Sequence, residues 1–496
     1  MKGYGKRKFV LNMLLMTAAM LIIRIIGMVF NIYFTSVIGA SSTGMYHLIF
    51  SVYGFMITFS LSGTSLAVTR LVSETGPSAG RACNAIVRKS LSICVTLSVI
   101  ATLSVWLFGK GISKTLFDNE YGAKALALLS ASLPAVSVSA VIRGYFMAAR
   151  KVVCVTASQI AEEFLSISIT LYLLSVIKNT PYSYMSMIAG IAFSAIIAAA
   201  ADIVMYRINI SPTLRESSVP APGYKDIFAI SVPVALGSYL RSALISAENI
   251  LIPKRLAMSG VASSLSEYGI IKGMSIPLMM FPAVFISSLA NMLVPELADR
   301  RANHKPNGIR YIGARAIELT LYFAFMAAGV FVMCHDVLGE KFYHNTKVGS
   351  YLGLLSLLVI PMYLDTVVDS MLKGLNEQVS SLKYNIIDSL LRVAFIWFVI
   401  PKKGVYAYIF LLYGSELFNL WLSLSRLVRV TGMTLKPLIL MKPLIISAIA
   451  YITADFTKYG ILIKAATFAV VYIALAIAME YHSSLSEKNT SKLWKI

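Results

Sequence analysis

The sequence predicts an all-α polytopic membrane protein with about 14 transmembrane helices. Three observations predict this class. Hydrophobic residues make up 57% of the 496 residues, charged residues make up only 14%, and the mean hydropathy is +0.75. Apolar segments of about 20 residues, long enough to cross a hydrocarbon layer about 30 Å thick, recur along the whole chain. No polar stretch is long enough to fold as a separate soluble domain.

The first expected span follows the basic stretch MKGYGKRK and continues past Arg24 to Phe34. This apolar run is too long for a cleaved signal peptide, so we expect it to remain as the first helix. The later spans are further apolar runs, separated by short loops that contain charged residues, Gly or Pro. We place the spans at residues 9–34, 46–69, 86–109, 122–147, 155–179, 182–206, 225–251, 266–293, 312–334, 350–373, 382–400, 404–428, 435–455 and 459–480.

The formal net charge of +21 comes from basic residues in the short loops between apolar segments. They are not gathered into one tail or face, which argues against nucleic-acid binding. With the N-terminus inside, the cytoplasmic segments hold about 27 Lys and Arg, and the external loops hold about 12. This asymmetry predicts a multi-pass protein of the cell membrane with both termini in the cytoplasm.

A Pro- and Ser-rich stretch after the sixth span predicts an exposed linker. Cutting there leaves six spans on each side and two at the end, and a faint repeat relates 44–74 to 266–300. Two six-span halves of equal orientation would be related by an axis along the membrane normal. The predicted parts are an N-terminal lobe (1–206), a cytoplasmic linker (207–224), a C-terminal lobe (225–428), and two additional transmembrane helices with a cytoplasmic tail (429–496).

Three of the basic residues inside expected spans are candidates for substrate binding. An arginine at mid-span costs at least about 2.5 kcal/mol, and snorkelling from there is strained, so we expect Arg24 and Arg241 to face a polar cavity and bind substrate. Lys272 is assigned to the same cavity, although it lies close enough to the predicted interface to reach it. Arg143, near the cytoplasmic end of the fourth span, is expected to be a surface anchor.

Acidic residues inside spans are candidates for the cavity wall or for an ion-coupling site. Glu248 lies two turns after Arg241 on the same helical face and is expected to pair with it. Asp365 and Asp369 lie one turn apart in the tenth span. For a further group the sequence leaves open whether each side chain caps a helix or lines a cavity; these are Glu162, Glu163, Asp202 and Glu416.

No catalytic site, metal site or cofactor is expected. The four cysteines form no CxxC pair, and the sequence has neither HExxH nor the GxxxxGK[ST] pattern of an ATPase. A membrane enzyme such as a glycan polymerase would need a polar catalytic cluster, usually on a large external loop. Asp336, Glu340 and His344 leave this alternative open only on a short loop, 334–350.

Three segments carry a resemblance to a known family. The stretches RIIGMVFNIYFTSVIGASSTGMYHLIF, SVSAVIRGYFMAARKVVCVTASQIAEE and YGIIKGMSIPLMMFPAVFISSLANMLVPELAD resemble the stage V sporulation protein B group. That group belongs to the polysaccharide transporter branch of the multidrug/oligosaccharidyl-lipid/polysaccharide (MOP) exporter superfamily. The resemblance implies two six-helix lobes around a central cavity, with two extra helices.

The resemblance also implies a function: flipping of a lipid-linked oligosaccharide by alternating access, with a peptidoglycan precursor for spore cortex as the family expectation. The implied partners are a lipid-linked sugar diphosphate and membrane lipids. The sequence leaves two energy sources open: the membrane potential, or a coupling ion, H⁺ or Na⁺, bound at Asp365, Asp369 or Glu248. The alternative is a cation-coupled multidrug exporter of the same superfamily. Such an exporter would favour a cavity of carboxylates and aromatic rings, and the mid-span arginines argue against it.

Overall fold

The computed structural model describes residues 2–76, 79–116, 120–177, 180, 182–210, 222–434, 437–457 and 460–493. All regular structure in these ranges is helical, and no strand occurs in them, which confirms the predicted all-α class. The chain divides into two compact units: unit 1 contains Met1–Gly269 and Ser389–Gly404, and unit 2 contains Ile270–Asp388 and Val405–Ile496.

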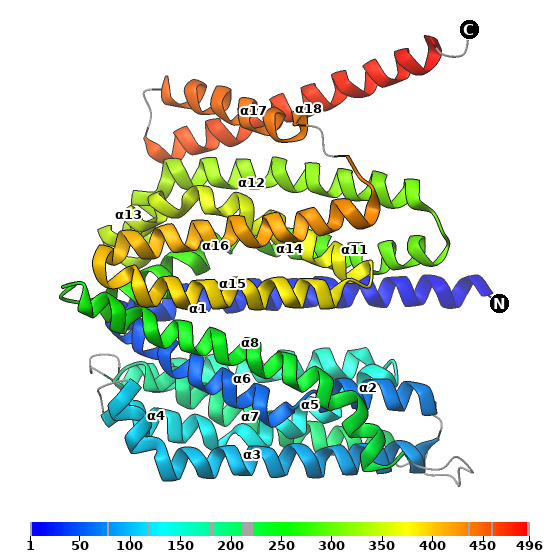
Figure 1. The fold of residues 1–496 in the computed structure, drawn as a ribbon, viewed down its shortest axis with the longest axis vertical. Coiled ribbons are helices and arrows are strands. Elements are labelled where there is room, and N and C mark those ends of the chain that lie inside the picture. Colours follow the sequence, from blue (N-terminus) through cyan, green and yellow to red (C-terminus); the bar gives the residue numbers. More distant parts are fainter. Residues whose placement is uncertain are drawn as a thin grey trace. The chain divides into compact units, whose positions relative to one another are not determined.

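Unit 1 is built mainly from the first nine helices (Figure 1). They are α1 (Lys2–Leu61), α2 (Thr64–Thr75), α3 (Gly80–Leu116), α4 (Glu120–Ala131), α5 (Leu133–Ala148), α6 (Val152–Ile177), α7 (Met185–Ile210), α8 (Tyr224–Met258) and α9 (Ser264–Tyr268).

The remaining helices belong mainly to unit 2, but Ser389–Gly404, the second part of α15 and the start of α16, belongs to unit 1. They are the π-helix η2 (Gly269–Ser275), α10 (Ile276–Met279), α11 (Ala283–Ala302), α12 (Pro306–Tyr343), α13 (Thr346–Leu355), the 3₁₀-helix η3 (Ser356–Leu358), α14 (Val359–Gly374), α15 (Gln378–Phe398), α16 (Ile400–Thr431), α17 (Leu438–Asp455) and α18 (Ile461–Leu493).

Within the described residues, eleven helices are long and apolar enough to cross a membrane, or twelve if the bent pair Ser264–Met279 and Ala283–Ala302 counts as one span. This agrees approximately with the expected 14. The expected spans 9–34 and 46–69 are separated at Gly39, where φ is 78° and ψ is 172° and two helices meet within α1. The second of these helices ends at Leu61, and α2 takes up the rest of that span from Thr64. The expected span 382–400 corresponds to α15, which is not among the eleven because it carries three charged residues.

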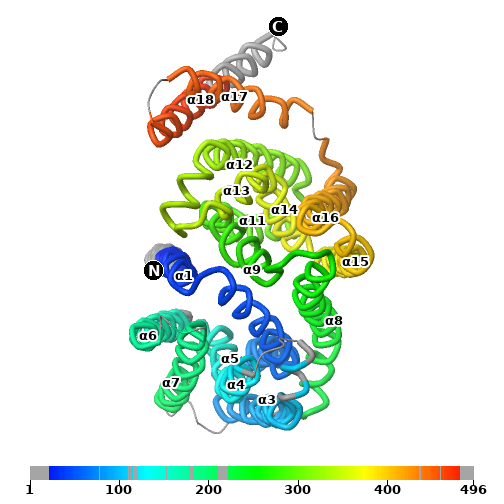
Figure 2. The backbone as a smooth tube through the Cα atoms, turned by 90° about the vertical axis from the view of Figure 1, so that its left-hand side faces the viewer, coloured from blue at the N-terminus to red at the C-terminus, as the bar shows by residue number. Residues whose placement is uncertain are grey.

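Small residues let the helices of unit 1 approach closely. Helix α6 packs along α7, and α5 packs against α2, α3 and α7 (Figures 1 and 2). A Cβ at Gly190 of α7 would clash with the Thr170 side chain of α6. A Cβ at Gly144 of α5 would lie 3.0 Å from the Ser65 carbonyl oxygen of α2. Glycine is therefore needed at both positions for the packing itself.

Helix α12 is the centre of unit 2, where it packs against α13, α14, α17 and α18 (Figure 2). Gly329 of α12 lies against the ring of Phe468 of α18, leaving no room for a larger residue at position 329. The Tyr472 hydroxyl, one turn further along α18, donates a 2.9 Å hydrogen bond to the Tyr322 carbonyl. Helix α18 is thus held against α12 within unit 2 by both apolar and polar contacts.

The expected linker, 207–224, lies mostly outside the described residues, between the end of α7 at Ile210 and the start of α8 at Tyr224. The two compact units do not separate there, because α8 packs along α1 and α2 within unit 1. The assignment of two six-helix lobes at the predicted boundaries stays a prediction.

Candidate functional site

Arg24 lies in the apolar part of α1, and its side chain is exposed. It makes no ion pair within the described parts of the chain. Gly27 follows one turn later, and a Cβ there would lie only 2.9 Å from Glu163 Oε1 of α6. Arg24 is therefore an unneutralised cation inside a candidate membrane span, Ile22–Thr75, with a carboxylate one turn away.

Arg241 occupies the equivalent situation on α8, within the candidate span Tyr224–Met258. Its side chain is exposed, and no carboxylate in the described ranges pairs with it. The expected partner, Glu248, pairs instead with Arg392 of α15, so that prediction was wrong. Glu248 is buried on α8, where α15 supplies a guanidinium directly opposite it. The positive charge of Arg241, two turns earlier, therefore has no carboxylate partner in the described ranges.

A polar seam joins α8 to the second half of α1. Thr58 Oγ1 donates to Ser242 Oγ at 3.2 Å, and the Tyr239 hydroxyl donates to Ser62 Oγ at 2.7 Å. Ser246 Oγ, further along α8, donates to the Ser51 carbonyl at 2.7 Å. Serine and threonine hydroxyls hold helices together inside membranes by such bonds.

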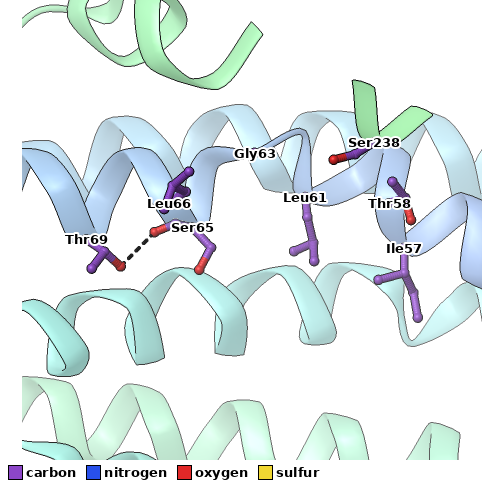
Figure 3. A pocket seen from close by; sticks show the side chains of 8 residues that line it. All are labelled: Ile57, Thr58, Leu61, Gly63, Ser65, Leu66, Thr69 and Ser238. Carbon is purple, nitrogen blue, oxygen red and sulfur yellow. Dashed lines mark hydrogen bonds between the residues drawn. The ribbon is translucent and has the colours of Figure 1, made fainter. Parts of the chain in front are cut away.

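A pocket of about 420 Å³ opens beside this seam (Figure 3). Figure 3 shows the Thr69 hydroxyl donating to the Ser65 carbonyl, at 2.9 Å, along one wall. Both polar and apolar side chains contribute to the lining, which consists of Ile57, Thr58, Leu61, Gly63, Ser65, Leu66, Thr69 and Ser238.

The pocket lies at a break between α1 and α2. Ser62 and Gly63 both have positive φ, 47° and 69°, and α2 starts directly after them. A Cβ at Gly63 would lie 2.8 Å from the Ser231 carbonyl oxygen of α8, so the break also permits close packing against α8. Irregular backbone inside a membrane is tolerated where protein buries it or where it lines a cavity.

Arg143 is at the centre of a polar network that sequence reasoning missed. Its Nε donates to Asp202 Oδ2 at 3.1 Å, and its Nη2 donates to Ser158 Oγ at 2.8 Å and to Glu162 Oε2 at 2.7 Å. The Arg143 side chain is only 17% exposed and that of Asp202 is 0% exposed. Arg143 is therefore not the expected surface anchor. It joins α5, α6 and α7 inside unit 1.

Lys272, the third expected cavity cation, lies in the π-helix η2 at the start of unit 2 and is partly buried. Short π-helical segments occur often at functional sites, because the extra residue per turn re-aims nearby side chains. The structure places Lys272 inside a candidate membrane segment, Ser264–Met279.

The expected acidic pair of unit 2 lies in a cluster of carboxylates, and Asp365, Asp369 and Asp388 each accept hydrogen bonds from a different residue. Asp365 Oδ2 accepts a bond of 3.1 Å from Asn419 Nδ2, while its Oδ1 is buried with no hydrogen-bond partner in the described part of the unit. Asp369 Oδ1 accepts a 2.5 Å bond from Ser381 Oγ, and Asp388 accepts from Ser415. No group of three or more His, Cys, Asp or Glu residues arranged to hold a metal ion occurs in the ranges that the structure describes.

The family model for polysaccharide biosynthesis proteins matches residues 9–300, more than half of the chain. This protein belongs to the polysaccharide biosynthesis protein family. Stage V sporulation protein B of Bacillus subtilis (strain 168) is 21% identical to this family member over 413 residues, which cover 81% of this chain and 79% of that protein. The expected resemblance is thereby confirmed.

Solved structures show the same fold as this polysaccharide biosynthesis family member. One is the lipid II flippase MurJ in an inward closed conformation, with a TM-score of 0.72, 14% identity, and coverage of 95% of this chain and 100% of that one. Another is an inward-facing multidrug resistance MATE family transporter of the MOP superfamily, with a TM-score of 0.58, 12% identity, and coverage of 83% and 96%. The chain therefore has the multi-pass membrane fold of MOP transporters.

Proposed function

We propose that this protein flips a lipid-linked oligosaccharide across the cell membrane by alternating access. The observation that supports this is the pair Arg24 and Arg241: both guanidinium groups are exposed, and neither makes an ion pair within the described residues. Lys272 is the third cation assigned to the pathway. The expected substrate is a peptidoglycan precursor. The similarity to a sporulation protein further suggests that this precursor is used to make spore cortex.

The chemistry of the substrate explains why cations would be needed. A lipid-linked sugar carries a diphosphate, and moving its charges through bare hydrocarbon costs tens of kcal/mol on a Born estimate. A guanidinium presents planar donors that match phosphate oxygens in pairs. Arg24 and Arg241 would bind the diphosphate while the apolar tail stays in lipid. The negative charge of the head group would then be neutralised while it crosses the membrane.

The energy source belongs to the same proposal. The membrane potential supplies about 2.3 kcal/mol per charge per 100 mV. An H⁺ or Na⁺ site is the other source, with Asp365, Asp369 and Glu248 as its candidate residues. Asp365 is the best placed of the three, because one of its buried oxygens lacks a hydrogen-bond partner in the described residues, whereas Glu248 is paired with Arg392.

The test is a flipping assay in proteoliposomes with a defined undecaprenyl-type diphosphate-sugar lipid. Arg24→Ala and Arg241→Ala are each expected to lower the initial flipping rate at least about tenfold, the effect of losing about 1.4 kcal/mol of binding. Arg70→Ala is the matched control, because Arg70 pairs with Glu74 on an exposed surface of α2. Wild-type rates in both pathway variants at equal reconstitution would overturn the assignment.

The second candidate is a cation-coupled multidrug exporter. The fold shared with a multidrug resistance transporter and the carboxylate cluster around Asp365 favour it. In the same proteoliposomes, transport of cationic dyes with no flipping of the diphosphate lipid would select this function.

A further inference from the structure

Two opposite charges, one on α1 and one on α6, lie about one helical turn apart along α1. Arg24 makes no ion pair in the described parts of unit 1, and the half-buried Glu163 makes no hydrogen bond or ion pair there either. The Glu163 carboxylate lies against the backbone of α1 at Gly27, where a Cβ would be 2.9 Å from Oε1 and 3.9 Å from Cδ. Arg24 and Gly27 are three residues apart, so they share one face of the helix.

The other charged residues near Arg24 and Glu163 already have ion-pair partners. Glu162, the preceding residue, is already bound to Arg143, which also holds Asp202. Successive residues point about 100° apart around a helix, so Glu162 faces α5 and α7 while Glu163 faces α1. The axial distance between Arg24 and Gly27 is only about 4.5 Å, well within the reach of an arginine side chain.

We propose that Glu163 is the counter-ion of Arg24 in the empty transporter and that the diphosphate of the substrate displaces it. This inference rests on the proposed function and adds a positioning residue to it. The two groups are neighbours in the structure without forming an ion pair. When the site is empty, a change of the Arg24 rotamer brings the guanidinium to the Glu163 carboxylate, which neutralises it within the membrane. When substrate enters, the guanidinium moves to the phosphate oxygens, and Glu163 is left as a nearby negative charge.

This exchange limits how tightly the substrate is held. The free energy of substrate binding is reduced by the cost of breaking the Arg24–Glu163 ion pair. Transport requires binding that is strong enough for entry and weak enough for release. The missing Cβ at Gly27 serves the same purpose, because it lets the carboxylate come close enough to α1 to compete for Arg24.

Equilibrium binding of a short-chain prenyl diphosphate to the purified full chain tests the exchange. Glu163→Gln is expected to lower the Kd by about threefold to tenfold, since it removes an ion pair that is only partly exposed. In an Arg24→Ala background the same substitution is expected to leave the Kd within about twofold, because the guanidinium is absent. Inorganic diphosphate is the second probe. If Glu163→Gln lowers its Kd by a similar factor, the effect is due to the phosphates and not to the lipid tail.

Glu162→Gln is the matched control, because it removes an equal charge from the adjacent residue, whose carboxylate is held by Arg143. No tightening is expected in this variant, and its thermal midpoint is measured alongside to verify folding. An unchanged or raised Kd in Glu163→Gln, or tightening that persists without Arg24, overturns the proposal.

A second measurement needs no ligand and separates this inference from the proposed function. A double-mutant cycle of Arg24→Ala and Glu163→Gln on the thermal midpoint of the empty protein is expected to be non-additive. Saturating diphosphate is expected to remove the coupling. Additive effects in the empty protein refute the counter-ion. Failure of the wild type to bind any diphosphate, with the coupling intact, refutes the proposed function instead.

Discussion

The arginines inside the spans of this membrane protein differ in whether a carboxylate neutralises their charge. Arg143 serves two carboxylates and a serine hydroxyl on two neighbouring helices, whereas Arg24 and Arg241 have no ion-pair partner in the described ranges. All three occur inside expected spans, so hydropathy alone does not distinguish them. What separates them is whether a carboxylate of a facing helix lies within ion-pair distance, as Glu162 and Asp202 do for Arg143.

Removing Arg143 is expected to destabilise unit 1 strongly. Arg143→Ala leaves the fully buried Asp202 carboxylate without its cation, and breaking such a pair costs about 3–5 kcal/mol. Thermal unfolding in detergent, followed by circular dichroism, measures the loss. Arg70→Ala is the control: its pair with Glu74 is 63% and 55% exposed, and loss of an exposed pair costs about 0–1 kcal/mol. Equal midpoints for the two variants would contradict the role assigned to Arg143.

At the scale of elements, the break between α1 and α2 depends on the backbone conformation of Gly63. Gly63 combines a left-handed φ of 69° with close approach to the Ser231 carbonyl. Gly54, two and a half turns earlier in α1, has helical backbone, and a Cβ added there would have no neighbouring atom within 4 Å. Backbone and packing therefore require glycine at position 63, whereas neither requires it at position 54.

Alanine at these two positions is expected to act in opposite directions. Gly63→Ala should destabilise by at least about 1–2 kcal/mol, because the left-handed conformation penalises a Cβ and the Ser231 carbonyl leaves little space. Gly54→Ala should be neutral or stabilise by up to about 1 kcal/mol, since alanine favours helix. Midpoints from thermal unfolding report both. A stabilised Gly63→Ala protein would show that the break is not needed for packing.

The elements themselves were largely predictable, because apolar runs of membrane length determine where helices lie. The sequence could not reveal where these helices break, since the kink at Gly39 depends on a φ of 78° and the break before α2 depends on the positive φ of Ser62 and Gly63. It identified Arg24, Arg241 and Lys272 as candidates from their position in spans. It paired Glu248 with the wrong arginine, because Arg392 is 144 residues away in the chain and only the tertiary structure brings it to α8.

For the whole molecule, the predicted even number of spans and the excess of basic residues in alternate loops predict that both termini lie in the cytoplasm. A C-terminal green fluorescent protein fusion is expected to fluoresce, because that reporter matures in the cytoplasm. An alkaline phosphatase fusion after Asn345 is expected to be active, since that loop is predicted to be external. A dark C-terminal fusion with an active phosphatase at the C-terminus would reverse the predicted topology.

The Arg143 network has a consequence for how the chain enters the bilayer. An isolated Arg, Asp or Glu at the centre of a helix resists partitioning from the translocon by about 2.5–3.5 kcal/mol. Arg143 and Asp202 are 59 residues apart, so at about 5–20 residues per second roughly 3–12 seconds of synthesis separate them. Because Arg143 gains both of its carboxylates only after α7 has been made, we expect α5, α6 and α7 to enter lipid together.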